Sequence, residues 1–262
     1  MKKFLILFLT HISLNIFPQE PVMQPAFVNA EKFSADAFAG HDQYGFTYYV
    51  SNNAVIKAKG KATWEYKKLA LGRVSRVDIQ NPLMVVVFYE DFNAVVLLDN
   101  QMNEIRQISF SDLENPIIAH AAGIASQNRL WVYNMATQQI GLFDFSTNIF
   151  SSLTSYSDGQ IIQYETTLLS FYWTDDKMNR YSCDLFGKIT NLGKVPSFDG
   201  MQVLNGSFLF SENGGLFYFS PKTNTTSAIG IAEKSFRGFH YNHQILSIFT
   251  KEGIINYKIE LP

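Results

Sequence analysis

The sequence predicts an all-β protein, a β-propeller of about six four-stranded blades. Short apolar and β-branched runs alternate with turn residues along nearly the whole chain. The turn after the long apolar strand recurs at intervals of about 37 to 45 residues, which is the period expected of propeller blades. Aromatic residues make up 15% of the chain and charged residues only 17%, which agrees with a globular β protein.

The clearest copy of the repeat spans residues 74–110. It contains three apolar runs and a looser fourth one, at Val74–Ile79, Leu83–Tyr89, Ala94–Leu98 and Ile105–Phe110. Polar breaks at Asp91–Asn93 and Asp99–Asn103 separate them, and Asp and Asn side chains bond their own backbone in turns. Four strands in succession form an antiparallel meander, the unit of a propeller blade.

The same order of strands recurs along the rest of the chain. The other five blades are expected within residues 35–66, 117–153, 161–193, 201–229 and 235–259. The last of them has only three strands, which would leave an open edge in the ring. We expect the extended segment around Ala26–Ala30 to supply the missing outer strand and close the ring.

Residues 1–19 are predicted to be a secretory signal peptide, because the basic Met1–Lys3 precedes the mostly apolar Phe4–Phe17. The stretch is too short and too interrupted for a membrane span. Its boundary lacks the usual small residues, so a retained anchor is the alternative. Residues 20–262 show no linker and no shift of composition, so we expect them to form a single propeller domain.

The formal net charge of −2 gives no electrostatic reason to expect nucleic acid or an anionic membrane as a partner. The single cysteine, Cys183, excludes an intramolecular disulfide and is expected to be a small buried side chain. No esterase elbow, zinc motif, phosphate loop or dinucleotide fingerprint occurs. We therefore predict no catalytic residues, no cofactor and no metal site.

Several polar residues lie at or near the innermost strands, where side chains can face the central channel: His41, His120, Asp36, Arg76, Asp78, Gln163 and Glu165. They could bind a small polar ligand, but we favour a hydrated, hydrogen-bonded lining. His240 and His243 would point to opposite faces of a strand, although a coil could bring them together. Asp175-Asp176 is interpreted as a hairpin turn, because a calcium loop needs more regularly spaced oxygen ligands.

The four-strand period, with turns such as Asp184-Leu185-Phe186-Gly187-Lys188-Ile189, resembles exported bacterial propellers of the YncE-like and pyrroloquinoline-quinone-repeat type. The chain departs from the tryptophan-docking signature of quinone-repeat enzymes, since Trp64, Trp131 and Trp173 do not occupy equivalent blade positions. Non-enzymatic members of this broad group are scaffolds in envelope assemblies, such as the barrel-assembly machinery and type IX secretion translocons. The N-terminal segment and the Phe/Tyr/Asn-rich composition are similar to secreted proteins of bacteria that use type IX secretion.

The resemblance implies a non-enzymatic periplasmic interaction subunit of an outer-membrane complex, for example an accessory or plug subunit of a type IX secretion translocon. Aromatic residues in or near turns, namely Phe92, Tyr172 and Phe145, are candidate anchors for a protein partner. The alternative is a ligand-binding or hydrolytic propeller, lactonase-like or glycan-active, that works at the channel mouth. Carboxylates and histidines converging on the axis would favour this alternative, whereas an apolar plug would favour the interaction subunit.

Overall fold

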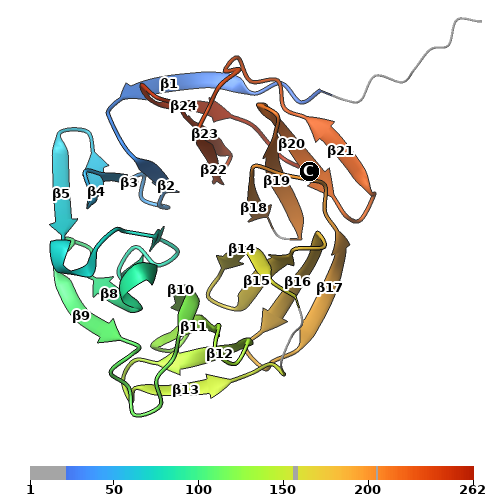
Figure 1. Cartoon of the computed structure of the whole chain (residues 1–262). Helices are drawn as coiled ribbons and strands as arrows, with labels where there is room; N and C mark the ends of the chain where they lie inside the picture. The colour runs from blue at the N-terminus through green and yellow to red at the C-terminus, as the bar shows by residue number, and fades with distance from the viewer. Residues whose placement is uncertain (1–21, 156–158, 205) are drawn as a thin grey trace, which may run out of the picture.

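The computed structural model describes residues 22–155, 159–204 and 206–262. Within these residues the strands form six four-stranded antiparallel sheets, arranged as the blades of a ring (Figure 1). The predicted six-bladed propeller is confirmed. The proposed signal peptide, residues 1–19, lies outside the described residues. The described part of the chain contains no helix that is both long and apolar enough to cross a membrane.

Each blade is a meander whose first strand is innermost. Blade one consists of β2 (Ala37–His41), β3 (Thr47–Ser51), β4 (Ala54–Lys59) and β5 (Ala62–Lys67). Blade two consists of β6 (Arg76–Asp78), β7 (Val85–Tyr89), β8 (Ala94–Leu98) and β9 (Glu104–Ser109). Short 3-10 helices, η1 (Leu69–Leu71) and η2 (Glu90–Phe92), lie before β6 and between β7 and β8.

The next three blades repeat this order. Blade three consists of β10 (Ala119–Ala125), β11 (Arg129–Asn134), β12 (Gln139–Asp144) and β13 (Ile149–Ser152). Blade four consists of β14 (Ile161–Thr166), β15 (Ser170–Asp175), β16 (Asn179–Asp184) and β17 (Ile189–Lys194). Blade five consists of β18 (Gly200–Leu204), β19 (Ser207–Glu212), β20 (Gly215–Ser220) and β21 (Thr225–Ala228).

Blade six combines both ends of the chain. It consists of β22 (Gly238–Asn242), β23 (Ile245–Phe249), β24 (Gly253–Lys258) and, as its outer strand, β1 (Ala26–Lys32). β1 pairs antiparallel with β24 from Ala26 opposite Lys258 to Lys32 opposite Gly253. Figure 1 shows β1 running along the outside of β24. The predicted closure by the N-terminal segment is confirmed, and the strand is two residues longer than expected.

The core is distributed between the blades. Each pair of neighbouring blades encloses one cluster of buried apolar side chains, the pair formed by blades six and one included. The middle strand β7 shows why its sequence is continuously apolar: Val86 and Phe88 pack toward blade three, and Val85 and Val87 pack toward blade one. A strand buried on both faces needs apolar residues at every position.

Asparagine side chains tie the turns of one blade to the next blade. Asn93, which has a left-handed φ of 50°, donates to the carbonyl of Ile117 (2.6 Å) and accepts from the N–H of Ala119 (2.9 Å). Asn53 makes the equivalent pair of bonds to Gly72 and Val74 of blade two. At these two junctions the turn asparagine therefore also joins neighbouring blades.

Candidate functional site

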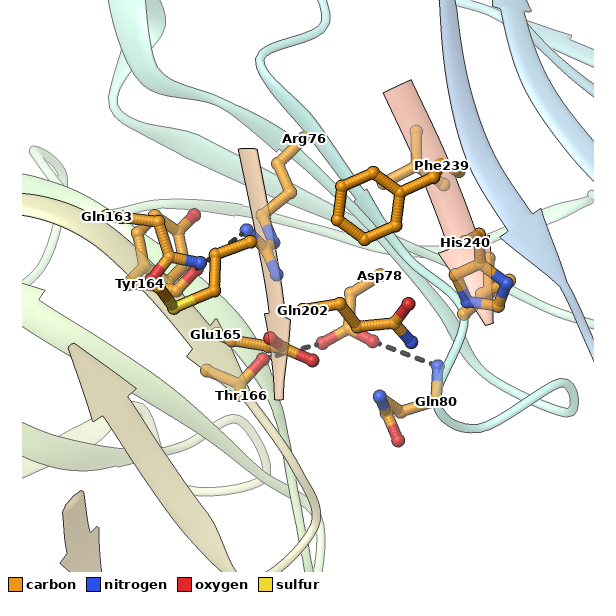
Figure 2. A pocket seen from close by; sticks show the side chains of 14 residues that line it. Arg76, Asp78, Gln80, Gln163, Tyr164, Glu165, Thr166, Gln202, Phe239 and His240 are labelled. Carbon is orange, nitrogen blue, oxygen red and sulfur yellow. Dashed lines mark hydrogen bonds between the residues drawn. The ribbon is translucent and has the colours of Figure 1, made fainter. Parts of the chain in front are cut away.

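The candidate site is a cavity on the axis of the ring. It measures about 170 Å³ and is lined by β2, β6, β14, β18 and β22, the innermost strands of five blades (Figures 1 and 2). Its polar side chains include Arg76, Asp78, Glu165, Gln202 and His240. The axis therefore carries no apolar plug, which was the feature expected to favour an interaction subunit.

Asp78 connects blades two, three and four. Its Oδ2 accepts from the N–H of Ile124 (2.8 Å) and from the hydroxyl of Thr166 (3.0 Å), and its Oδ1 accepts from the N–H of Gln80 (2.9 Å; Figure 2). Gly123 makes this approach possible, because a Cβ there would lie 2.8 Å from Asp78 Oδ2 and closer still to Thr166 Oγ1. The hydrogen bonds of the Asp78 carboxylate therefore hold blades two, three and four together.

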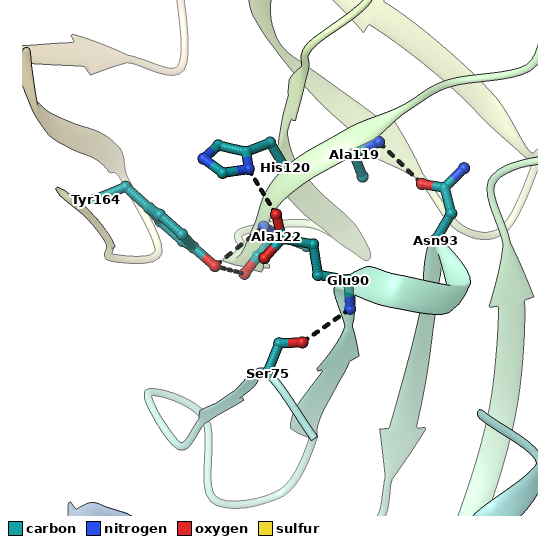
Figure 3. A network of polar contacts seen from close by, with 7 residues as sticks. All are labelled: Ser75, Glu90, Asn93, Ala119, His120, Ala122 and Tyr164. Atoms are coloured by element: carbon teal, nitrogen blue, oxygen red, sulfur yellow. Dashed lines mark hydrogen bonds and ion pairs between the residues drawn. The ribbon is translucent and has the colours of Figure 1, made fainter. Parts of the chain in front are cut away.

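Arg76 and Tyr164, two residues before Asp78 on β6 and Thr166 on β14, join the same blades. The Arg76 guanidinium lies 4.4 Å from the centre of the Tyr164 ring and donates to the Tyr164 carbonyl (3.1 Å). The Tyr164 hydroxyl in turn donates to the carbonyl of Ala122 on blade three (3.4 Å; Figure 3). The cation is therefore stabilised by an aromatic face and a carbonyl.

Glu165 links blade four to blade five, since its Oε2 accepts from the N–H of Val203 (2.7 Å). Burial raises the pKa of the Glu165 carboxyl, and the Val203 N–H and the nearby Arg76 and Arg180 act against this shift. Desolvation outweighs the stabilisation of the charged form at this position.

The remaining connections run from blade five through blade six to blade one. The Gln202 amide donates to the Tyr241 carbonyl (2.8 Å) and accepts from its N–H (2.7 Å). His240 Nδ1 accepts from the N–H of His41 (3.4 Å), and the Asn242 amide donates to the His41 carbonyl (2.8 Å). Burial, and secondarily His41, lowers the pKa of His240 to about 3, so its ring is neutral near pH 7.

A second buried cation, Arg180, lies behind the cavity wall and was not identified from the sequence. It is fully buried, and its Nη1 donates to Gln163 Oε1 (2.5 Å) and Thr174 Oγ1 (2.8 Å). Burial lowers its pKa to about 10. Its Nε and Nη2 have no hydrogen-bond partner among the described residues. An arginine inside the third strand of a blade, where other blades have apolar residues, is the signal that could have revealed it.

The expected channel residues fall into two groups. Arg76, Asp78, Gln163 and Glu165 line the cavity, as expected. Asp36 does not, because its Oδ2 accepts from the N–H of Asn52 in a turn of its own blade (2.8 Å).

The two other histidines named from the sequence lie at different ends of the channel. His41 lies at its mouth, next to a second cavity. His120 does not line the axial cavity; its Nδ1 lies 2.6 Å from Glu90 Oε1 on the opposite face of the ring (Figure 3). The sequence interpretation also missed His240 as a lining residue, having considered it only as a metal ligand.

The two other polar motifs form no metal site within the described residues. His240 lies on β22, and His243 follows in a turn with φ of 47°. No group of three His, Cys, Asp or Glu side chains suited to a metal occurs in the described part of the chain. Asp175 Oδ1 accepts from the N–H groups of Lys177 (2.9 Å) and Asn179 (2.7 Å), as a turn-forming aspartate does.

One face of the ring carries a row of exposed apolar side chains, which we call the docking strip. Its members are Leu69, Phe92, Ile118 and Met135, each at least half exposed. They belong to turns between the second and third strands of a blade and to connections between blades, which meet on one face of the ring. The candidate anchor Phe92 is thus confirmed as exposed.

The other two candidate anchors are not comparably exposed. Phe145 is wrong as an anchor, because it is 8% exposed. The N–H of Phe145 donates to the carbonyl of Asn128 (3.2 Å), and the ring packs in the core between blades two and three. Tyr172 is half-buried beside Arg180. Cys183 is fully buried, as expected.

The tryptophans occupy unlike positions, as the sequence indicated: Trp131 and Trp173 lie on the second strands of their blades and Trp64 lies on an outer strand.

The sequence matches no protein-family model and is not significantly similar to any curated protein. Solved structures with the same fold include virginiamycin B lyase from Staphylococcus aureus, with 12% identity over 84% of this chain and 79% of that one and a TM-score of 0.57. A streptogramin B lyase has 10% identity over 91% of this chain and 87% of that one, also with a TM-score of 0.57. The extracellular domain of the putative one-component system BT4673 from B. thetaiotaomicron has 12% identity over 90% of this chain and 40% of that one, with a TM-score of 0.53. At such low identity these similarities establish the β-propeller fold alone.

Proposed function

We propose that this chain is an exported, non-enzymatic β-propeller of the periplasm that docks as an interaction subunit on an outer-membrane protein complex, for example a type IX secretion translocon. The observation that supports this most is the docking strip across blades two and three. Large exposed apolar side chains that adjoin one another on one surface are typical of protein–protein contact sites.

Backbone and side-chain contacts connect the segments that carry the strip. The Phe92 ring lies against Gly72, whose N–H donates to the carbonyl of Leu69 (3.2 Å). The N–H of Met135 donates to the carbonyl of Ile118 (2.7 Å). Asn93, next to Phe92, is bonded to Ile117 and Ala119 on either side of Ile118. The segments that carry the four side chains are therefore joined to one another by backbone and asparagine hydrogen bonds.

The strip is also rigidly supported. Asn93 holds the turn after Phe92 to the next blade, and the Asn134 side chain accepts from the N–H groups of Ile118 (3.2 Å) and Ala136 (3.1 Å). A partner that binds here does not have to order these turns first, which lowers the entropic cost of association.

Most polar side chains near the axis of the ring have a structural role. Asp78, Tyr164, Gln202 and Asn242 each bond to a different blade from their own, so their side chains serve to hold the ring together. A catalytic group instead needs an uncommitted atom within reach of substrate.

The test is a mild-detergent pull-down of the tagged full chain from envelope membranes, followed by mass spectrometry. We expect a stoichiometric outer-membrane protein with the native chain and with Ile149→Glu, which adds a charge at a 59% exposed position on the outer strand β13. Ile118→Glu and Met135→Glu add the same charge within the docking strip and should abolish the capture. Recovery of the native chain alone, or equal capture by all three variants, would contradict the proposal.

A further inference from the structure

We infer that the axial cavity is a binding site for an uncharged, hydroxylated six-membered ring, the chemistry of a monosaccharide or a cyclic polyol. This inference is independent of the docking strip, which lies on the outer surface. It rests on the size of the cavity, its access, the polar atoms left uncommitted and the balance of charge around it.

The size fits one ring. The cavity measures about 170 Å³. An engineered apolar cavity of about 150 Å³ in another protein accommodates benzene, so a six-membered ring fits a space of this size. An oligosaccharide would have to extend beyond it.

The cavity is continuous with an opening on the face opposite the docking strip. A second hollow of about 240 Å³ shares Ile79, Gln80, Gln202 and His240 with the axial cavity. It also includes His41, the last residue of β2, and Asp42, Gln43 and His243, which follow β2 and β22. A small molecule therefore reaches the axis from this side without displacing a blade.

Three polar groups remain available to a ligand. Glu165 uses Oε2 for the N–H of Val203, and its Oε1 makes no hydrogen bond within the described residues. His240 accepts at Nδ1 from His41, which leaves the proton of the neutral ring on Nε2 as a donor. The side-chain amide of Gln80 supplies both a donor and an acceptor (Figure 2). Hydroxyl groups both donate and accept, so they match this mixed set.

Phe239 adds an apolar wall, and Figure 2 shows its ring beside the cavity between Arg76 and His240. Ligand pockets combine apolar or aromatic walls with a few placed polar groups. The carbon face of a hydroxylated ring can pack against such a wall while its hydroxyls meet Glu165 and Gln80.

The charge balance favours a neutral ligand. Arg76 and the buried Arg180 are cations, and Asp78 and Glu165 are the carboxyl groups that act on them electrostatically. With Glu165 ionised, the two carboxylates and the two cations compensate each other formally. A charged ligand would bring an uncompensated charge into the interior of the ring, which is unfavourable.

The test is isothermal titration calorimetry on the full chain with D-glucose, D-galactose, D-mannose and myo-inositol, and with D-glucuronate, a ring of the same kind that carries a carboxylate, as the charged probe. We expect saturable, millimolar or tighter binding of at least one of the four neutral rings. Glu165→Gln replaces the acceptor Oε1 by a donor and should weaken binding roughly tenfold. Glu104→Gln is the matched control, because Glu104 lies on β9 at the outside of blade two, paired with Lys68. The affinity of this variant for the rings should be unchanged.

Ala39→Phe fills the cavity from β2 and should abolish binding. Thermal unfolding shows whether Ala39→Phe folds. If it does not fold, the affinity of Glu165→Gln for the rings serves as the test. Absence of saturable binding by all four rings would overturn the inference. Tighter binding of D-glucuronate than of any neutral ring, or undiminished binding by folded Ala39→Phe, would overturn it as well.

Discussion

Replacing Asp78 by alanine should destabilise the whole ring, because this carboxylate connects three blades. Asp78 is 5% exposed and accepts three hydrogen bonds, from Ile124, Thr166 and Gln80. Leaving a buried donor without its partner costs about 1–3 kcal/mol. Gln80 is exposed, so its N–H can bond to water in the variant. The lost stability therefore comes from the donors of Ile124 and Thr166, which are left without an acceptor. We expect the free energy of unfolding to fall by about 3–4 kcal/mol.

The assay is urea unfolding followed by circular dichroism at neutral pH, with the midpoint compared at constant slope. Asp36→Ala is the matched control, because Asp36 makes one bond to the backbone N–H of Asn52 at an exposed turn and should lose only about 0.5–1.5 kcal/mol. A loss below about 1 kcal/mol for Asp78→Ala would show that the bonds around Asp78 do not hold the blades together.

Three further changes test other parts of the structure. Gly123→Val should prevent Thr166 and Asp78 from meeting and should lower the melting temperature more than Gly238→Val, where a Cβ meets nothing within 4 Å, measured by differential scanning calorimetry. The free energy of unfolding should decrease as the pH falls from 6.5 toward about 3, because the unfolded state takes up the proton that folded His240 excludes. The limiting slope is about 1.4 kcal/mol per pH unit. In urea titrations at several pH values, His240→Gln should flatten this dependence. Burial raises the pKa of Cys183 to about 11, so at pH 8 its alkylation in the folded chain should be much slower than in urea, and equal rates would contradict its burial.

The fold could be predicted because its signals are local. Strands buried on both faces leave continuous apolar runs such as Val85–Tyr89, and the turns between them carry Asn or Asp. Strand counting was sufficient to predict that the N-terminal segment completes blade six, because a three-stranded blade would expose an open edge.

The site could be predicted only in part, because its contacts join residues far apart in the sequence. Asp78 and Thr166 are 88 positions apart, and no local pattern predicts that Gly123 lets them meet. Its position on an inner strand was sufficient to identify Glu165 as a residue that lines the cavity. The same criterion wrongly included Asp36, whose side chain bonds to a turn of its own blade. Phe145 follows a turn aspartate and was a candidate anchor for that reason, yet it packs between blades, where such an aromatic residue is more often found.

The measurement that tests the central claim most directly is site-specific photo-crosslinking in the producing cells. A photoreactive amino acid replaces Met135 in the docking strip or, in a separate variant, Ile149 on the outer edge of the same blade; both positions are at least half exposed. The interaction proposal predicts a crosslink from position 135 to one outer-membrane protein and none to that protein from position 149. Equal crosslinking from both positions, or none from position 135, would contradict it.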